Sequence, residues 1–283
     1  MNLTDTFAFS PGAYLAPVVD WLNTNFHPFF EGVSTVVEAV LNGIGVALLF
    51  LPFYAVIAIA FLLVALLVNV RVSAVTVIAL LFCVLMGFWE ASMQTLALVA
   101  VSVAISVLIA FPLGVIASRH KKFEAAIRPV LDIMQTVPPW VYLIPAVVIF
   151  SLGEVPAIIA TIIYGVPPML RLTTLAFNQV PKDLLELGRA TGASPRTILL
   201  KIEIPSAIPT LAVGLNQCIL LSLAMVVLAG LVGAGGLGAE VTRGLTRMEM
   251  GLGLRAGLSI VALAIFLDRL SSGALQRRRN DHA

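Results

Sequence analysis

Pro181 to Pro205 reads PKDLLELGRATGASPRTILLKIEIP and is a polar interruption between two long apolar runs. Gly192 can adopt the left-handed backbone that ends a helix, because glycine lacks the Cβ that opposes this conformation. Ser194 is a residue type that caps helix N-termini, and Pro195 suits a first helical position. The stretch therefore predicts two short helices around a turn, outside the membrane that the flanking runs would cross.

The composition of the whole chain indicates that lipid surrounds most of it. Hydrophobic residues make up 60% of the 283 residues and charged residues 11%, whereas soluble domains average about 45 to 50% and about 25%. We therefore expect an all-α integral membrane protein. A spanning helix needs roughly 17 to 25 residues, and about seven apolar segments are long enough: Leu49 to Val68, Val72 to Phe88, Met93 to Ala117, Ile133 to Leu152, Val155 to Phe177, Ile208 to Leu231 and Leu254 to Leu270. The second segment is short, so a re-entrant segment or a tight hairpin is an alternative there.

The basic residues predict the orientation, because Lys and Arg are retained in the cytoplasm while acidic residues count for little. No Lys or Arg precedes Arg71. With the N-terminus outside, all but three of the 17 basic residues fall in inner loops or the C-terminal tail, the exceptions being Arg243, Arg247 and Arg255. The 181–205 loop and the C-terminus are then cytoplasmic. The net charge of +2 reflects this topology and does not indicate nucleic-acid binding.

Ahead of the first span, apolar residues recur at helical spacing with polar residues among them. Pro11, Pro17 and Pro28 are expected to break this stretch into pieces. We predict one or two amphipathic helices in residues 1–48. Two placements fit equally well: on the outer membrane face, or packed on the protein's own spans.

Met134 to Pro145, MQTVPPWVYLIP, concentrates prolines at the start of a predicted span, which must be kinked or interrupted. Backbone groups freed by proline are tolerated at membrane depth only where protein or water satisfies them, so this segment is expected to line a cavity. Trp140 and Tyr142 could offer π faces to a cation, although an interfacial aromatic belt is the alternative. The candidate lining residues are Gln135, Thr136, Pro138, Trp140 and Tyr142.

A second set of candidates lies in the helix that begins near Ile208. Asn216 and Gln217 carry polar groups into an apolar run, where such groups either mark a pathway or hold helices together. The sequence leaves both roles open. Downstream, Gly230 to Gly238 reads GLVGAGGLG and predicts close helix packing or a hinge.

Residues for catalysis or metal binding do not converge. No Gly-x4-Gly-Lys-Ser/Thr occurs, so the chain cannot cradle nucleotide phosphates. Cys83 and Cys218 lie in predicted spans, where cysteine behaves as a small hydrophobe. The three histidines are scattered and have no metal-ligand spacing. We expect no bound metal, no cofactor and no enzymatic activity in this chain.

The 181–205 stretch resembles the cytoplasmic signature of ABC importer permeases, which runs Glu-Ala-Ala, three residues, Gly, nine residues, then Ile-x-Leu-Pro. Leu187 and Gly188 replace the two usual alanines, and Ile204 replaces the leucine. In that family the loop enters a cleft on the ATPase subunit and transmits nucleotide-driven motion. The resemblance implies this coupling role for Glu186, Leu187, Gly188, Gly192, Ala193, Ser194, Pro195, Ile202, Ile204 and Pro205.

From about Trp21 to Leu270 the chain is more specifically similar to glycine betaine/proline betaine permeases. The likeness is strongest in Asp132 to Pro145, Gly165 to Leu175 and Gly192 to Arg196. It implies a five-helix core of the methionine-importer type with extra N-terminal helices. It also implies a homodimer, two ATPase subunits that bind ATP and Mg²⁺, and an outer binding protein that delivers a quaternary ammonium compound such as choline, glycine betaine or proline betaine.

This reading assigns residues 1–48 to an outer interfacial segment, 49–92 to accessory spans, 93–271 to the permease core and 272–283 to a basic cytoplasmic tail. Two alternatives differ in function. A permease for amino acids such as methionine would share the loop and differ along the pathway. A stand-alone ion-coupled carrier would need no ATPase.

Overall fold

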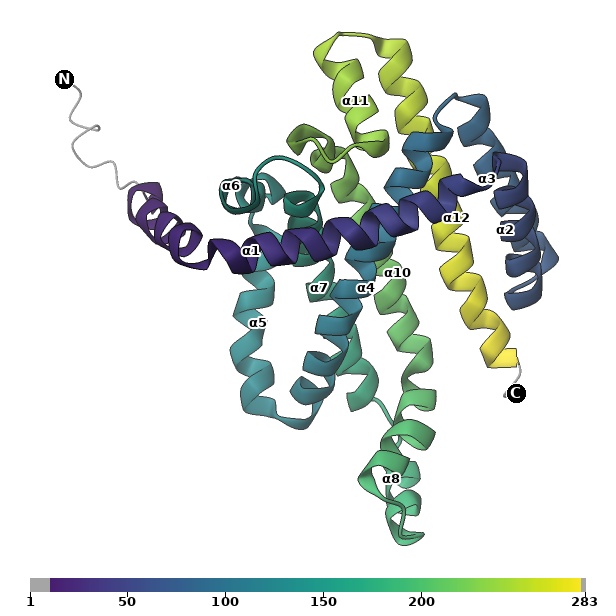
Figure 1. Ribbon diagram of the computed structural model, residues 1–283. Coiled ribbons are helices and arrows are strands. Elements are labelled where there is room, and N and C mark those ends of the chain that lie inside the picture. The colour runs from purple at the N-terminus through teal and green to yellow at the C-terminus, as the bar shows by residue number, and fades with distance from the viewer. Residues whose placement is uncertain (1–10, 281–283) are drawn as a thin grey trace.

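The computed structural model describes residues 11–280, which fold into helices joined by short turns, with no β-strand among them (Figure 1). A π-helical turn, Leu199–Glu203, joins α9 to α10, and a 3-10 turn, Gly230–Val232, follows α10. The described chain is all-α, as the sequence predicts. Its α-helices are α1 Pro11–Phe50, α2 Phe53–Leu67, α3 Val70–Leu85, α4 Trp89–Arg119, α5 Lys121–Thr136, α6 Pro139–Phe150, α7 Glu154–Asn178, α8 Lys182–Ala190, α9 Pro195–Ile198, α10 Ile204–Ala229, α11 Gly236–Thr246 and α12 Met250–Asn280.

The centre of the bundle is α7, which packs along both α4 and α10. Small residues permit this close approach: a Cβ at Gly114 of α4 would lie 2.6 Å from the Cβ of Thr173 on α7. Helix α12 packs on α10, α11 and α3, which places α2 and α3 at the periphery. Large side chains that are fully buried in the central contact include Ile158, Leu170, Met225 and Val226.

Each apolar segment predicted to span the membrane overlaps a helix or a helix pair. Helices α2 and α3 are apolar but shorter than the others, and α5 and α6 would form one bent span. The count of about seven spans agrees with these elements, and α1 is a further long apolar helix. The segments long and apolar enough to cross a membrane singly are Pro17–Phe50, Trp89–Arg119, Glu154–Asn178, Pro195–Val232 and Met250–Gly273.

The predicted interruption near Met134 is present, but the span from Ile133 to Leu152 is not one helix. Helices α5 and α6 meet at an angle of 93°. Val137 and Pro138 between them are extended, because a proline drives the residue before it away from the helical region. Helix α5 also begins at Lys121, so most residues between the predicted spans that end at Ala117 and begin at Ile133 are helical.

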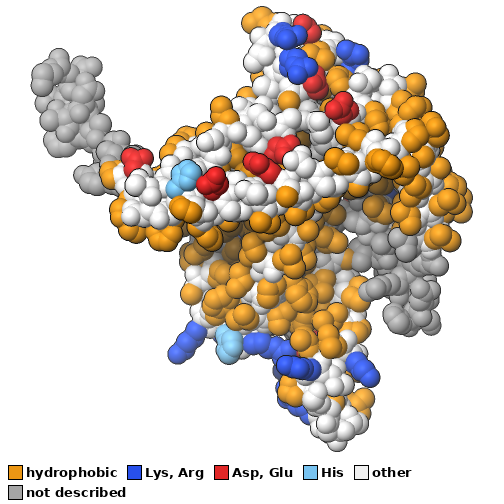
Figure 2. Space-filling view, in the orientation of Figure 1, with side chains coloured by type: hydrophobic (Ala, Val, Ile, Leu, Met, Phe, Trp, Pro, Cys, Tyr) orange, Lys and Arg blue, Asp and Glu red, His pale blue; other side chains and the backbone are white. Residues whose placement is uncertain are grey.

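The N-terminal segment differs from the prediction of separate pieces, because α1 continues through Pro17 and Pro28. Tertiary contacts support it: Asn23 Nδ2 donates to Val148 O of α6 at 3.5 Å, and the rings of Phe30 and Phe150 are 5.4 Å apart. Figure 1 shows α1 lying crosswise over the bundle, and Figure 2 shows acidic side chains and a histidine along one edge of α1, with hydrophobic side chains below them. Residues 1–10 lie outside the described part.

The two predicted placements of α1 each describe one side of the helix. Near its C-terminal end, Leu41 is 5% exposed in the main core. Along the other side of the helix, Trp21, Phe29, Val46 and Phe50 remain exposed. The helix therefore packs on the bundle along one side and presents an apolar face along the other.

Charged side chains gather at the two ends of the bundle. Figure 2 shows basic side chains around the α8 end and a hydrophobic band between them and the charged residues near α1 and α11. Helix α12 runs from the α11 end towards the α8 end and continues to Asn280, into the segment assigned to a tail. This distribution is typical of a bundle that crosses a membrane.

Candidate functional site

The 181–205 stretch forms the helix-turn-helix that its sequence predicts. Gly192 follows α8 with φ +73°, and its N–H donates to Arg189 O at 3.0 Å. The N–H of Ala193 donates to Gly188 O, also at 3.0 Å, which completes a Schellman motif. Ser194 then caps α9 by accepting from the Thr197 N–H at 3.3 Å, and Pro195 is the first residue of that helix. Each local prediction is confirmed.

The two arms of the loop pack together because residue 188 has no side chain. A Cβ at Gly188 would lie 2.7 Å from Ile202 Cδ1 and 3.3 Å from Ile198 Cγ1. Gly188 is accordingly buried, while Glu186 beside it is exposed. The absence of a side chain at Gly188 therefore allows α8 to pack closely against the α9 arm.

The outer surface of the loop is apolar as well as exposed. Leu187 is 61% exposed and Leu200 is 63% exposed. Figure 1 shows α8 projecting beyond the rest of the bundle. Exposed leucines on a projecting turn form a surface suited to a protein partner.

The second arm is continuous with a helix that crosses the bundle. Residues Pro195–Val232 form one uninterrupted helical segment through the π-turn. Ile204 and Pro205 begin α10 directly after the π-turn, in which the Ile204 N–H donates to Leu199 O, five residues back. Pro205 has no N–H to donate. With about 1.5 Å rise per residue, α10 extends about 39 Å from the loop. A displacement of the loop would therefore move α10 directly.

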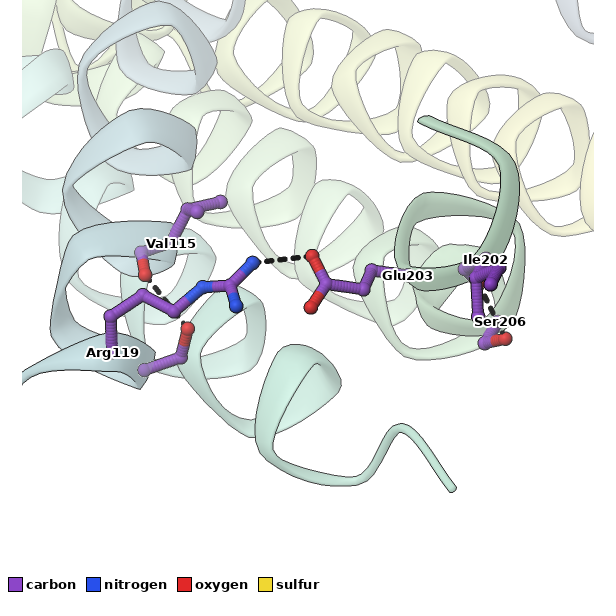
Figure 3. A network of polar contacts seen from close by, with 6 residues as sticks. Val115, Arg119, Ile202, Glu203 and Ser206 are labelled. Carbon is purple, nitrogen blue, oxygen red and sulfur yellow. Dashed lines mark hydrogen bonds and ion pairs between the residues drawn. The ribbon is translucent and has the colours of Figure 1, made fainter. Parts of the chain in front are cut away.

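An ion pair between Arg119 and Glu203 was not predicted from the sequence. Arg119 ends α4 and Glu203 ends the π-turn, and Figure 3 shows the guanidinium pointing at the carboxylate. The Glu203 side chain is 5% exposed and that of Arg119 is 48% exposed. The signal available in the sequence was the acidic residue Glu203, which stands among the apolar residues of the Ile202 to Pro205 string. The pair joins the base of the loop to a second helix of the core.

The pathway candidates near the α5–α6 bend stabilise the broken backbone. Thr136 Oγ1 donates to Asp132 O at 2.9 Å, and the Tyr142 hydroxyl donates to Ile133 O at 2.9 Å. Trp140 is 52% exposed. The arrangement is consistent with a bend beside a cavity, and a pathway role for Gln135, Thr136, Pro138, Trp140 and Tyr142 stays a prediction.

Asn216 connects two helices, one of the two roles that the sequence left open. Its Nδ2 donates to Asp268 Oδ1 at 2.9 Å, and its Oδ1 accepts from Ser271 Oγ at 2.8 Å. Both partners belong to α12. Gln217 next to it is exposed. A pathway role for Gln217 stays a prediction.

Replacing Asn216 with leucine is expected to destabilise the α10–α12 contact. The change leaves the Asp268 carboxylate and the Ser271 hydroxyl without this partner, which costs about 1 to 3 kcal/mol for a partly buried polar group. Thermal unfolding of the purified protein in detergent should show a lower midpoint. Gln217→Leu is the matched control and should change the midpoint little; equal shifts for both variants would contradict the assignment.

The glycine-rich stretch after α10 packs closely, as predicted. Gly235 and Gly236 have φ of +72° and +64°. The N–H of Gly236 donates to Gln94 Oε1 at 3.0 Å, and that of Leu237 donates to Thr95 Oγ1 at 2.9 Å. The start of α11 is thereby held on α4.

The helical core and the projecting loop define the class, a membrane component of a transport system. Residues 110–280 match the family model described as binding-protein-dependent transport system inner membrane component, and the chain belongs to that family. It is a transport component rather than an enzyme. The match covers the core helices and the loop together.

Three relatives with named transport systems are similar to most of this chain. The chain is 43% identical over 253 residues to the glycine betaine/proline betaine transport system permease protein ProW of Escherichia coli K12, covering 89% of this chain and 72% of the relative. It is 39% identical over 263 residues to the glycine betaine transport system permease protein OpuAB of Bacillus subtilis, covering 93% of each. It is 40% identical over 205 residues to the glycine betaine/carnitine transport permease protein GbuB of Listeria monocytogenes, covering 72% and 73%.

A solved structure shares the fold. An inward-facing conformation of the MetNI methionine ABC transporter matches with a TM-score of 0.59 and 24% identity, covering 65% of this chain and 92% of the matched chain. The five-helix importer core expected from the sequence is therefore confirmed. At this identity the likeness concerns the fold alone.

Proposed function

We propose that this chain is the permease subunit of an ATP-driven importer for a quaternary ammonium compound of the glycine betaine type. The observation that carries the importer assignment is the projecting 181–205 turn, with its capped helices and exposed leucines continuous with α10. The named relatives support the substrate class. The functional complex would contain two copies of this chain, two ATPase subunits and an outer substrate-binding protein.

The orientation follows from the same features. The basic side chains around α8 favour the cytoplasm for that end of the bundle. Helix α12 ends towards this side, so the C-terminus is cytoplasmic and the N-terminus lies outside, with α1 along the outer interface. The loop then faces the ATPase, and α11 and the acidic edge of α1 face the binding protein.

The geometry supports the following mechanism. ATP and Mg²⁺ bind to the partner ATPases, whose closure draws the two loops together. Each loop moves α10 because Pro195–Val232 is one helical segment, and the Arg119–Glu203 pair moves the end of α4 with it. Rearrangement of α4 and α10 around α7 opens the pathway outwards to accept substrate, and hydrolysis resets it.

The assignment is tested in proteoliposomes that contain the purified complex, with labelled glycine betaine and binding protein outside and ATP inside. We expect glycine betaine uptake to require both ATP and the binding protein. Excess methionine should not inhibit this uptake. Methionine uptake instead would identify an amino-acid permease. Uptake driven by an ion gradient without the ATPase would identify a stand-alone carrier and overturn the proposal.

A further inference from the structure

A cavity of about 540 Å³ lies between α4, α5 and α7, in the half of the bundle nearer α8. Charged side chains of both signs line it. Glu124 and Arg128 occupy the α5 turns near its start, while Asp132 and Arg171 lie deeper. Sites that hold small molecules typically have about 300 to 1,000 Å³, so this volume suffices for a small ligand.

The charges in the cavity form two ion pairs. Arg171 Nη2 donates to Asp132 Oδ1 at 2.5 Å, which joins α7 to α5. Arg128 Nη2 donates to Glu124 Oε1 at 2.5 Å along α5. The side chain of Asp132 is 62% exposed and that of Arg171 is 43% exposed, so the deeper pair is accessible from the cavity.

The deeper pair lies too far along its helices to be an ordinary surface contact. At about 1.5 Å per residue, Asp132 is about 16 Å along α5 from Lys121 and Arg171 is about 10 Å along α7 from Asn178. A charged side chain exposed to lipid at membrane depth is costly, so such groups face water or protein. The cavity is therefore an aqueous recess that enters the membrane from the α8 side.

The deep end of the recess adjoins the bend between α5 and α6. Thr136 Oγ1 donates to Asp132 O, and Tyr142 donates to Ile133 O across the 93° bend. Irregular backbone at membrane depth is tolerated where it is buried in protein or lines a water-filled cavity, and here it lies beside the recess. A change in the bend angle would consequently move Asp132 and alter access to the pair.

We propose that this recess is the inner vestibule of the translocation pathway, and that Asp132 and Arg171 bind the zwitterionic substrate as it leaves. This rests on the proposed function. The quaternary ammonium group of the substrate lies against the Asp132 carboxylate, and its carboxylate accepts hydrogen bonds from the Arg171 guanidinium. A planar guanidinium suits a carboxylate in a two-point contact, and an ammonium without N–H groups needs only the opposite charge.

Substrate binding would replace the Asp132–Arg171 ion pair with one ion pair from the substrate to each residue, which favours the exchange. A zwitterion supplies one charge to each partner as the pair opens, so neither Asp132 nor Arg171 is left unpaired. Because both side chains are partly exposed, water screens their mutual attraction, and a ligand can open the pair at little cost. A ligand with a cation alone would leave Arg171 uncompensated, so the site discriminates in favour of zwitterions.

Accessibility and occupancy are tested with a cysteine at Leu175, an apolar residue that lines the cavity and is 43% exposed. Cys83 and Cys218 are replaced by alanine, and the whole complex is assayed in inside-out vesicles. The probe is a membrane-impermeant methanethiosulfonate that carries a trimethylammonium group. We expect Leu175→Cys to react, and excess glycine betaine to slow the reaction at least tenfold. Ile78→Cys on the exposed apolar face of α3 is the matched control and should not react.

The alternative role for the pair, a structural connection of α5 to α7, is tested by the double variant Asp132→Asn/Arg171→Gln. Its amides can retain a hydrogen bond but supply neither charge. We expect glycine betaine uptake to fall at least tenfold with an unchanged midpoint of thermal unfolding. Normal uptake by this variant would overturn the proposal.

The outcomes separate this inference from the proposed function. ATP-driven uptake by the cysteine-free complex, measured in parallel, tests the importer assignment alone. If that uptake is normal while Leu175→Cys does not react, or is not protected by glycine betaine, the vestibule proposal is wrong and the importer assignment is unaffected. If the cysteine-free and unmodified complexes both lack uptake, the proposed function fails.

Discussion

Gly192→Asp is expected to abolish ATP-driven uptake while leaving membrane insertion intact. Gly192 has φ +73°, a backbone conformation that costs a residue with a Cβ about 1 to 2 kcal/mol. No atom outside its chain neighbours lies within 4 Å of a Cβ built there, so the chain itself would not obstruct the new side chain. The carboxylate would project from the turn into the surface proposed to contact the ATPase. Uptake in proteoliposomes and ATPase co-purification measure the effect.

A matched control separates backbone strain from loss of coupling. Gly87 has φ +80°, and a Cβ there likewise meets nothing within 4 Å, but it lies between α3 and α4 at the opposite end of the bundle. Gly87→Asp should carry similar strain and retain uptake. If Gly87→Asp and Gly192→Asp lose uptake equally, or if Gly192→Asp transports normally, the coupling assignment fails.

Arg119→Gln is expected to uncouple ATP hydrolysis from transport and to destabilise the base of the loop. The change leaves the Glu203 carboxylate, which is 5% exposed, without its cation. Losing a hydrogen bond to a charged group costs about 1.5 to 3 kcal/mol. Because Arg119 is itself half exposed, we expect a loss below the about 3 to 5 kcal/mol typical of breaking a fully buried pair. Thermal unfolding and the ratio of substrate transported to ATP hydrolysed are the measurements.

The reciprocal variant gives the control for this pair. Glu203→Gln leaves Arg119 able to turn towards water, so its unfolding midpoint should fall less than that of Arg119→Gln. The double variant, with two neutral amides, should be more stable than Arg119→Gln alone. Equal midpoints for both single variants, with normal coupling, would show that the ion pair is incidental.

Local features of the fold were predictable because they depend on neighbours in the sequence. The turn after α8 needs a residue that tolerates positive φ, and Gly192 supplies it. The cap needs a side-chain oxygen before Pro195, and Ser194 supplies it. The spans are likewise set by runs of apolar residues longer than the hydrocarbon thickness requires.

The continuity of α1 shows where local rules are insufficient. Pro17 and Pro28 each remove a backbone donor and disfavour a helix interior by about 3 kcal/mol or more. The helix nevertheless continues through both, and the contacts of Asn23 and Phe30 with α6 lie on either side of Pro28. These contacts join residues more than a hundred positions apart, so the pattern around each proline could not reveal them.

The sequence by itself determined the membrane environment, the approximate spans and the geometry of the 181–205 turn, because apolar length and backbone preference are properties of short segments. Only the tertiary structure decided which polar and charged side chains meet. Arg119 meets Glu203, Asp132 meets Arg171 and Asn216 meets Asp268. Each pair depends on the rotation and depth of two packed helices, and these follow from how buried side chains of all the helices fit together.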